Sequence, residues 1–294
     1  MTLAQHAAAC YADQAWFGTV TVTENVRLAR DTYRVRFEAP PIARRIVPGQ
    51  FVMVRLAGYD DPLLGRPLAL YDTVLDAGGE PVGIDLVYLV TGKLTGKLAT
   101  FSPGQKLQVW GPLGNGFAPR PAEHLIMVAG GIGQTPFVAL AREALGQRAY
   151  GDASRARAGV RRVTLCYGAR TRDFLAGIDD FEAVGATVRV STNDGTAGHH
   201  GLVTDLLRDA LQEQGDLAAC RVVCCGPEPM LAAVAGITGE FGVPCEVSLE
   251  TPMACGIGIC FSCVARVRDG KGGWDYRRTC VEGPVFDAQA IVFE

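Results

Sequence analysis

Hydrophobic and polar residues alternate in short segments over the first third of the chain. The alternating segments are 19–22, 33–37, 51–56, 84–90 and 106–110. Breaks that contain glycine and proline, such as Pro48-Gly49 and Pro103-Gly104, separate them. A period of two with such breaks is typical of antiparallel strands joined by turns. We therefore expect five or six strands without helices, which form a small antiparallel β-barrel over residues 17–112.

A different pattern begins near residue 113. Residues 125–129 form a continuous apolar run, which is followed at once by glycines and a helical stretch. Further strand candidates alternate with helix candidates: strands at 163–167, 187–190 and 221–225, and helices at 137–145, 203–213 and 229–241. This alternation indicates a parallel sheet covered by helices, here a Rossmann-like α/β domain over residues 113–244. Segment 146–159 has no apolar period and is expected to be an exposed loop.

Four cysteines near the C-terminus follow the spacing C-x4-C-x2-C-x16-C, and they are Cys255, Cys260, Cys263 and Cys280. Two glycines between the first cysteines allow the backbone to fold around an inorganic core. The first part of this spacing matches plant-type [2Fe-2S] ferredoxins, so the four cysteines are predicted metal ligands. Residues 245–294 are too few for a core of their own, and a bound cluster would stabilise them as a small third domain.

Other interpretations of these cysteines are a zinc site, disulfides or buried thiols. A structural zinc site usually contains two C-x2-C pairs, whereas here the first gap is four residues and Cys280 stands alone. Disulfides need an oxidising compartment, and buried thiols do not explain the neighbouring glycines. The other cysteines mostly lie in apolar segments and are expected to be small buried hydrophobic residues. They are Cys10, Cys166, Cys220, Cys224, Cys225 and Cys245.

Composition limits the classes of function. The chain has 294 residues, of which 48% are hydrophobic and 20% charged, enough for two or three globular domains. Its net charge of −3 and the lack of a polybasic run argue against nucleic acid as a partner. The N-terminal residues lack the pattern of a secretory signal, and no apolar stretch approaches the roughly 20 residues of a transmembrane helix. We therefore expect a cytoplasmic protein without a membrane partner.

The first loop of the α/β pattern has the composition of a nucleotide site. Gly130, Gly131 and Gly133 let the backbone approach a pyrophosphate, and they precede a predicted helix whose N-terminus favours negative charge. Thr135 suits a helix cap and Pro136 the first helical position. The spacing is not the G-x-G-x-x-G fingerprint, so a tight turn without a ligand is the alternative.

A second loop, Cys225-Gly226-Pro227, follows the last strand candidate of the α/β pattern. It lies at the carboxyl edge of the predicted sheet, where ligands of open α/β sheets bind. Alone it is also compatible with a simple turn before a helix. Two such loops on one edge support each other as parts of one nucleotide site.

Three further residues carry weaker signals. Arg66 lies in an apolar strand, where its planar guanidinium suits a phosphate, although an arginine in a surface ion pair is the alternative. His199 and His200 are expected to be loop residues, because no third metal ligand lies near them in sequence. The chain contains no G-x-S-x-G, H-E-x-x-H or Walker motif.

The order of these parts resembles the ferredoxin-NADP reductase superfamily: a barrel with Arg66-Pro67, an α/β domain with Gly-Gly-Ile-Gly-x-x-Pro and Cys-Gly-Pro-x-Pro-Met, and then a cysteine domain. Within it, segments 253–263 and 279–286 look like the cluster motif of the electron-transfer subunits of NAD-dependent dihydroorotate dehydrogenases. The resemblance covers roughly residues 17–285. It implies the cofactors FAD, NAD and a [2Fe-2S] cluster.

The resemblance also implies a set of contacts for each cofactor. FAD would contact Arg66, Pro67, Leu68 and Ala69, then Val87, Tyr88 and Leu89, then Leu94, Thr95 and Gly96. NAD would lie over Gly130, Gly131 and Gly133 and near Cys225, Gly226 and Pro227, and the cluster ligands would be Cys255, Cys260, Cys263 and Cys280. Two departures concern the FAD contacts. Many relatives have serine or threonine where this chain has Ala69, and the segment 92–95 replaces their Gly-x-Gly-Thr.

The implied function is an oxidoreductase subunit that shuttles electrons between NAD(H), FAD and a [2Fe-2S] cluster. It would exchange them with a separate FMN-containing dihydroorotate dehydrogenase catalytic subunit of pyrimidine biosynthesis, in a hetero-oligomer such as a heterotetramer. No catalytic residue for orotate chemistry is identified in this chain. One alternative is an electron-transfer subunit of a hydrogenase or of an NADH-dependent ferredoxin:NADP oxidoreductase, and the segment 167–172 leaves NAD and NADP open. A zinc-stabilised nucleotide-binding regulator is an alternative of another class.

Overall fold

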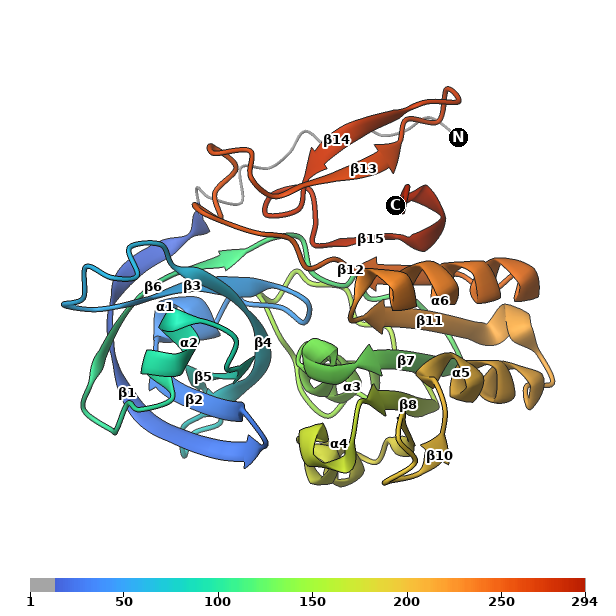
Figure 1. Ribbon diagram of the computed structural model, residues 1–294, viewed down its shortest axis with the longest axis horizontal. Coiled ribbons are helices and arrows are strands. Elements are labelled where there is room, and N and C mark those ends of the chain that lie inside the picture. The colour runs from blue at the N-terminus through green and yellow to red at the C-terminus, as the bar shows by residue number, and fades with distance from the viewer. Residues whose placement is uncertain (1–13, 294) are drawn as a thin grey trace.

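A computed structural model describes residues 14–293 of the chain. Its N-terminal part is a closed six-stranded antiparallel barrel, at the left of Figure 1, with the strand order β1-β2-β5-β4-β3-β6. The strands are β1 (Trp16–Ala29), β2 (Thr32–Glu38), β3 (Phe51–Leu56), β4 (Arg66–Leu75), β5 (Pro81–Leu89) and β6 (Lys106–Leu113). Alternate residues of these strands fill the barrel, and this confirms the period of two and the antiparallel fold.

The expectation that the barrel has no helices is wrong. Two short helices join its strands, α1 (Pro40–Ala43) and α2 (Lys93–Leu98), with four and six residues. Neither is long enough to show a helical period in the sequence. The first begins at a proline, which suits the first position of a helix. In the second, Leu94 and Leu98 fill the barrel core.

The central part is a mostly parallel sheet of seven strands, as expected, with the order β10-β9-β8-β7-β11-β12-β15. The strands are β7 (His124–Gly130), β8 (Arg162–Ala169), β9 (Thr187–Thr192), β10 (His199–His200), β11 (Cys220–Cys225), β12 (Cys245–Ser248) and β15 (Val285–Asp287). The helices are α3 (Phe137–Ala144), α4 (Ile178–Val184), α5 (Val203–Gln212) and α6 (Glu228–Phe241). Short 3-10 turns are η2 (Gly131–Gln134), η3 (Arg172–Phe174), η4 (Leu217–Ala219) and η5 (Ala288–Ala290).

The C-terminal segment is part of this sheet as well as a separate hairpin. Strand β12 is parallel to β11, and β15 pairs antiparallel with β12. Between β12 and β15 the chain first forms a loop that contains Cys255, Cys260 and Cys263, which we call the cysteine loop. It then forms the hairpin of β13 (Val264–Arg268) and β14 (Trp274–Arg278), at the top of Figure 1. The sequence patterns did not predict α4, which has only seven residues, or the strands from β12 onward. Strands β12 and β15 have four and three residues, and β13 and β14 have no buried face that would give an apolar alternation.

The cysteine loop shares a small core with the barrel. Cys263, Cys280 and Val281 pack against Phe51 and Met53 of β3. This agrees with the expectation that the last segment is too short for a core of its own. Trp110 of β6 adds a hydrogen bond from its indole Nε1 to the carbonyl oxygen of Cys255, at 2.9 Å.

Segment 146–159 is not simply the exposed loop that its composition predicted. Tyr150 is 4% exposed and belongs to the core of the barrel. The Arg155 guanidinium donates to Glu143 Oε1 at 2.7 Å and to the carbonyl oxygen of Phe117 at 2.7 Å. The segment therefore ties the sheet to the barrel, through contacts that a local pattern cannot reveal.

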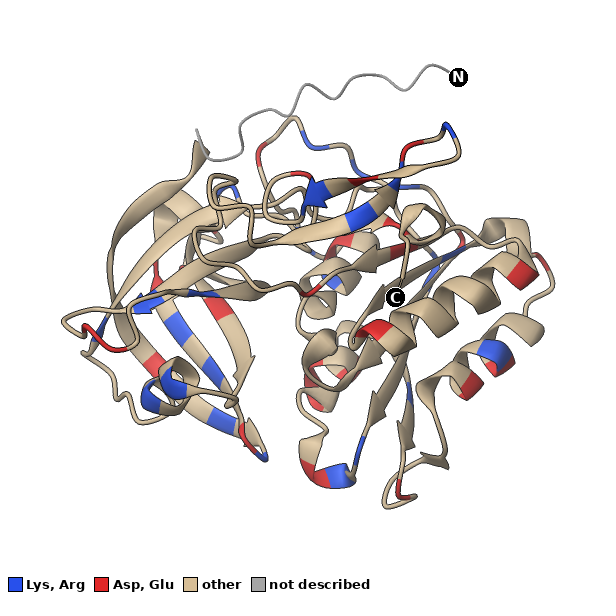
Figure 2. Ribbon diagram, turned by 45° about the horizontal axis from the view of Figure 1, so that its top comes forward, with Lys and Arg blue, Asp and Glu red and all other residues tan. Residues whose placement is uncertain are grey.

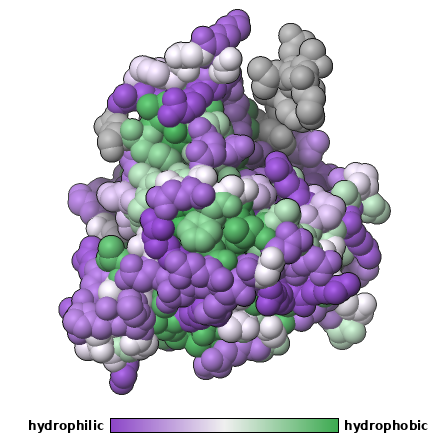
Figure 3. All heavy atoms as spheres, turned by 90° about the vertical axis from the view of Figure 1, so that its right-hand side faces the viewer, coloured by the Kyte–Doolittle hydropathy of each residue, from purple (hydrophilic) through white to green (hydrophobic). Residues whose placement is uncertain are grey.

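The surface carries both signs of charge. Figure 2 shows acidic and basic residues interspersed along the barrel and the helices. Figure 3 shows one end of the molecule, where hydrophilic residues cover most of the face around a central group of hydrophobic residues. Within residues 14–293, we find no helix with the length and apolar character needed to cross a membrane.

We predict that His124, at the start of β7, makes stability depend on pH. Its ring nitrogens lie 3.1 Å from Gln214 Oε1 and 2.8 Å from Thr164 Oγ1, and burial lowers its pKa below the usual 6.5. Below about pH 6.5 the unfolded chain therefore binds a proton that the folded chain resists. We expect the free energy of unfolding to be retained above that pH and to fall as the pH drops further.

Urea unfolding at about pH 7.5 and about pH 5.5 checks this expectation. In a His124→Gln variant the difference between the two pH values should shrink. His200→Gln is the matched control, because His200 is exposed on β10. An unchanged pH dependence in the His124 variant would show that another group is responsible.

Candidate functional site

The two loops predicted to bind a nucleotide meet at the carboxyl edge of the parallel sheet. Strands β7 and β11 are neighbours, so the loops that follow them lie side by side. A Cβ added at Gly133 would lie 2.2 Å from the carbonyl oxygen of Cys225, and one at Gly226 would lie 3.0 Å from the backbone nitrogen of Gly130. Such distances are closer than packed carbon atoms tolerate, so glycine is required where the two loops touch.

The helix after the first loop begins at Phe137, as its predicted range of 137–145 has it, but Pro136 precedes its first position. Residues Gly131–Gln134 form the 3-10 turn η2, and Gly131 adopts a φ of +56°, which favours glycine. Pro136 is the cap residue of α3 and Phe137 is its first residue, with no side-chain cap. Thr135 therefore does not cap the helix. The loop tightens through η2 before the α-helix starts.

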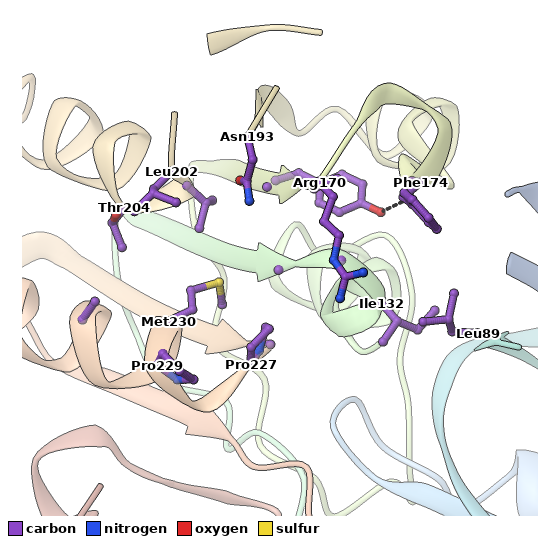
Figure 4. A pocket seen from close by; sticks show the side chains of 18 of the residues that line it. Leu89, Ile132, Arg170, Phe174, Asn193, Leu202, Thr204, Pro227, Pro229 and Met230 are labelled. Atoms are coloured by element: carbon purple, nitrogen blue, oxygen red, sulfur yellow. Dashed lines mark hydrogen bonds between the residues drawn. The ribbon is translucent and has the colours of Figure 1, made fainter. Parts of the chain in front are cut away.

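A cavity of about 720 Å³ lies over this edge, between the sheet and the barrel. Five of the residues predicted to bind a cofactor line it, namely Gly130, Gly131, Gly226, Pro227 and the barrel residue Leu89. Gly133 and Cys225 do not line it, since they lie behind it and hold the two loops together. Figure 4 shows Leu89 and Ile132 at the end of the cavity nearest the barrel and Pro227, Pro229 and Met230 along one wall. The volume and the mostly apolar lining are typical of cofactor sites.

The cavity lining contains one basic and one acidic residue, Arg170 and Glu250. Figure 4 shows Arg170 extending from the end of β8 toward Ile132. Glu250 follows β12, which the sequence pattern did not predict as a strand. Sequence reasoning also missed Thr32, Asn193 and Thr204, which come from three separate elements and carry no common motif.

The residues predicted to contact FAD lie on β4, β5 and α2, at one side of the barrel. The side chains of Leu68, Tyr88 and Leu94 fill the barrel core, so any contact with a flavin would use their backbone. The Tyr88 hydroxyl donates to Asn25 Oδ1 at 3.0 Å inside the barrel. Val87 instead packs in the core that also contains β7 and α3.

Arg66 at the start of β4 fits a phosphate. Its side chain is exposed, and the guanidinium donates to the carbonyl oxygens of Leu64 at 3.2 Å and Gly65 at 3.0 Å. Among residues 14–293, Arg66 has no acidic partner, so the alternative of a surface ion pair finds no support there. The guanidinium keeps further N–H groups for the oxygens of a phosphate.

Thr95 shapes the segment 92–95. Its hydroxyl accepts hydrogen bonds from the backbone nitrogens of Thr91 at 3.0 Å and Gly92 at 3.2 Å. The side chain is thus engaged by its own loop before α2. The backbone of this loop, together with the glycine at position 96, is the part of the segment that remains open to a ligand.

The four predicted cluster cysteines come together as two pairs. Cys263 Sγ lies 3.1 Å from Cys280 Sγ, and this contact lowers the pKa of Cys263 while it raises that of Cys280. Contacts with Ser262, and more weakly with Cys255, lower the pKa of Cys260 to about 6. A low pKa favours the thiolate form, which is the form that binds metals. Among the described residues, no three His, Cys, Asp or Glu side chains converge as tightly as a single ion requires.

Two pairs of sulfurs, three from the loop before β13 and one from the turn after β14, fit a [2Fe-2S] cluster, which has two irons and four cysteine ligands. Gly258 is required here, because it has a φ of +82° and an added Cβ would lie 2.6 Å from Val281. The other cysteines of the described residues are free, and Cys166, Cys220, Cys224 and Cys245 are buried as expected. Cys225 is partly exposed, and Cys10 lies outside the described residues.

The sequence predicted that His199 and His200 lie in a loop. They instead form the two-residue edge strand β10. Both are exposed, and His199 Nε2 lies 3.0 Å from Asp205 Oδ2. Neither histidine belongs to a metal-binding group within residues 14–293. They play no part in the cavity.

Family models match three consecutive segments of the chain. Residues 19–117 match an oxidoreductase FAD-binding domain and residues 127–236 an oxidoreductase NAD-binding domain. Residues 250–292 match the iron-sulfur cluster binding domain of dihydroorotate dehydrogenase B. The cofactors are therefore FAD, NAD and an iron-sulfur cluster, and these matches favour the cluster over zinc.

Curated relatives match over nearly their whole length. The chain is 35% identical to the dihydroorotate dehydrogenase B (NAD(+)) electron transfer subunit of Desulforamulus reducens, over 91% of this chain and 95% of the relative. It is 36% identical to the subunit of the same name from Bacillus caldolyticus, over 93% of this chain and 97% of the relative.

Solved structures show the same arrangement of domains. A chain of an NADH-dependent reduced ferredoxin-NADP oxidoreductase superimposes with a TM-score of 0.77 at 29% identity, over 93% of this chain and 90% of that one. Phthalate dioxygenase reductase, at 18% identity and a TM-score of 0.58, shares the fold over 93% of this chain and 96% of that one. The chain belongs to the family of electron transfer subunits of dihydroorotate dehydrogenase B (NAD(+)).

Proposed function

We propose that this protein passes electrons between NAD(H), FAD and a [2Fe-2S] cluster, and exchanges them with a separate FMN-containing dihydroorotate dehydrogenase catalytic subunit. The observation that carries the proposal is the cavity between barrel and sheet. It is lined by Leu89 of the barrel and by the glycine loops of the sheet, so a nucleotide and a flavin can meet there. A bound flavin supplies the conversion between a two-electron hydride and the single electrons that a cluster accepts.

The proposed cofactor residues follow from these positions. We assign FAD to Arg66, Pro67, Leu68 and Ala69, to Val87, Tyr88 and Leu89, and to Leu94, Thr95 and Gly96. NAD is assigned to Gly130, Gly131 and Gly226 with Pro227, while Gly133 and Cys225 keep the two loops in contact. The cluster is assigned to Cys255, Cys260, Cys263 and Cys280. The exposed guanidinium of Arg66 and the paired sulfurs support this assignment.

We also propose the division into an FAD-binding barrel at 17–112, an NAD-binding domain at 113–244 and a cluster domain at 245–294. Asn115 supports close coupling of the second and third parts. Its side chain donates to the carbonyl oxygen of Val285 at 2.8 Å and accepts from the backbone nitrogen of Val285 at 3.1 Å. The last segment therefore adds two strands to the sheet of the second domain as well as holding the cluster.

The cysteine loop offers an apolar surface for the catalytic subunit. Ile259 and Phe261 are 74% and 62% exposed, and they flank the exposed Cys260. Trp110, which donates to the carbonyl oxygen of Cys255 in the same loop, lies with its ring centre 6.2 Å from that of Phe17, which is 64% exposed. Exposed apolar groups beside a redox centre suit a partner that must approach closely. We propose this cluster-loop surface, made of Phe17, Trp110, Ile259 and Phe261, as the contact with the catalytic subunit.

We predict that Phe261→Ser weakens binding of the catalytic subunit by about 10-fold, because truncation of a central aromatic contact typically costs 1 kcal/mol or more. Reduction of an artificial dye by NADH should remain unchanged, since the dye needs no docking surface. Trp274→Ser is the matched control, because Trp274 is also exposed but lies on the β14 hairpin. Equal affinity of the Phe261 variant and wild type, measured by titration calorimetry, would place the contact elsewhere.

Orotate-dependent NADH oxidation tests the whole proposal. It is measured anaerobically with this protein alone and then with a co-expressed dihydroorotate dehydrogenase catalytic subunit from the same source. Activity only in the mixture is the expected result. Fast dye reduction without any orotate dependence would keep the cofactors and reject this partner.

A second candidate is a subunit of an NADH-dependent ferredoxin:NADP oxidoreductase. The observation that favours it is the likeness of the whole chain to such a protein at 29% identity. The relatives named as dihydroorotate dehydrogenase subunits are more similar in sequence, at up to 36%. Reduction of NADP+ by reduced ferredoxin in the presence of this protein would favour the second candidate.

We further propose a cytoplasmic location and a hetero-oligomeric assembly such as a heterotetramer. The free cysteines of the described residues support a reducing compartment, because thiolate ligands must remain reduced. The names of the relatives as subunits support an assembly. Size-exclusion chromatography of the co-expressed proteins with light scattering measures its stoichiometry.

A further inference from the structure

Two adjacent residues of the barrel strand β4, Tyr71 and Asp72, are bound to the sheet domain rather than to the barrel alone. Their partners lie on α3, on α4 and in segment 146–159. We call this group the β4 clasp, and its members are Tyr71, Asp72, Arg142, Arg148, Tyr150 and Asp180. None of them lines the cavity.

The clasp depends on an irregularity in β4. The register between β4 and β5 shifts between Leu70 and Asp72, which leaves Tyr71 as an extra residue. In a regular strand, neighbouring side chains point to opposite faces, whereas a bulge bends the strand and redirects them. Here it allows two consecutive side chains to reach the neighbouring domain.

Tyr71 connects the barrel to the start of α4. It is 2% exposed, and its hydroxyl donates to Asp180 Oδ2 at 2.6 Å. Its ring packs in the same core as Phe137, Leu165 and Phe181 of the sheet domain. An added Cβ at Gly177 would lie 2.4 Å from the Tyr71 oxygen, so glycine is needed there for the hydroxyl to reach α4.

Asp72 connects the barrel to α3 and the segment that follows it. The carboxylate is buried, and Oδ1 accepts hydrogen bonds from Arg148 Nη1 at 2.8 Å and from the Tyr150 hydroxyl at 2.6 Å. Arg142 Nε of α3 lies 3.0 Å from Oδ2. Two arginines and a tyrosine thus surround one buried carboxylate. If the carboxylate moved away from the two arginines, a buried charge would lose its partner, so the network resists such a movement.

The clasp joins the elements that carry the two cofactors. Strand β4 begins with Arg66–Ala69, assigned above to FAD, and continues directly into Tyr71 and Asp72. Helix α3 follows the glycine loop assigned to NAD. A shift of the clasp would therefore change the distance between the two bound cofactors.

We propose that Tyr71 and Asp72 are positioning residues, which fix the distance between nicotinamide and flavin and so set the rate of hydride transfer. The inference rests on the proposed function of the cavity. Hydride transfer requires reacting atoms about 3–3.5 Å apart, and a misplacement of about 1 Å can cost roughly 100-fold in rate. The barrel and the sheet carry one cofactor each, so the contact between them decides this distance.

The test measures single-turnover reduction of bound FAD by NADH in the full chain, together with the dissociation constant of NADH. We expect Tyr71→Phe and Asp72→Asn each to slow hydride transfer by at least about 10-fold while NADH affinity stays within about twofold of wild type. The Tyr71→Phe and Asp180→Ala losses should not add in the double variant, because each change removes the same hydrogen bond, the first its donor and the second its acceptor. Tyr276→Phe and Asp209→Asn are matched controls at exposed positions.

Hydrogen exchange of residues 146–159 gives an independent readout. Asp72→Asn should speed exchange there, because Arg148 and Tyr150 lose their charged partner. Unchanged hydride transfer in both variants, or a rate loss matched by an equal loss of NADH affinity, would overturn the positioning role. If a variant does not retain FAD, Asp180→Ala removes the same hydrogen bond from the sheet side. Failure of wild type itself to be reduced by NADH would reject the proposed function instead.

Discussion

Replacement of Cys263 by serine is expected to stop electron transfer to the catalytic subunit while NADH-driven reduction of an artificial dye stays largely intact. Cys263 is buried against Cys280, at 3.1 Å between their sulfurs, and is one of four thiolates assigned to the cluster. Iron-sulfur clusters prefer soft thiolate ligands, and a serine oxygen is a harder ligand. The flavin lies earlier in the proposed electron path than the cluster, so a dye that accepts electrons from it should be unaffected.

The measurement combines visible absorbance and electron paramagnetic resonance of the cluster with both activities. Cys220→Ser is a matched control, because Cys220 is also buried but lies in the apolar core of the sheet domain, where its sulfur donates to the carbonyl oxygen of Asp216 at 3.5 Å. It should keep the cluster signal and both activities. An equal loss of dye reduction and partner-dependent activity in the Cys263 variant, with FAD retained, would contradict the assigned order of electron transfer.

Replacement of Gly133 by alanine is expected to reduce the rate of flavin reduction by NADH by about 100-fold. The new Cβ would lie 2.2 Å from the carbonyl oxygen of Cys225, so the loop after β7 must move away from the loop after β11. Both loops border the cavity through Gly130, Gly131 and Gly226. Overpacking of this kind also costs about 1–3 kcal/mol of stability.

Reduction by dithionite separates this effect from a loss of cofactors, because it needs no nucleotide site. The Gly133 variant should be reduced by dithionite like wild type but slowly by NADH. Gly236→Ala is the matched control, since it lies in the middle of α6 with no atom within 4 Å of an added Cβ. Alanine there should raise helix stability by about 0.5–1 kcal/mol without changing the rate. A normal NADH rate in the Gly133 variant would mean that the two loops do not shape the nucleotide site.

The sequence by itself determined the features that local patterns express. Strands β1 to β3 show the alternating pattern, and β7 and β11 show continuous apolar runs. Each of these strands has more than five residues, which is long enough for its pattern to be recognised. The first three cysteines and the glycines at 130, 131 and 133 lie within short loops, so their chemistry can be recognised without the fold. The resemblance added the order of the three domains and their cofactors.

Only the tertiary structure decided which distant residues come together. Glu250 lines the cavity because β12 joins the sheet beside β11, and four residues of strand are too few to be recognised in sequence. Segment 146–159 looked like an exposed loop, yet Tyr150 and Arg148 bind Asp72 more than 70 positions away. The bulge at Tyr71 depends on the register with β5. These residues come into contact because segments that are distant in sequence pack together in the fold. No property of a local segment specifies which distant segment it will pack against.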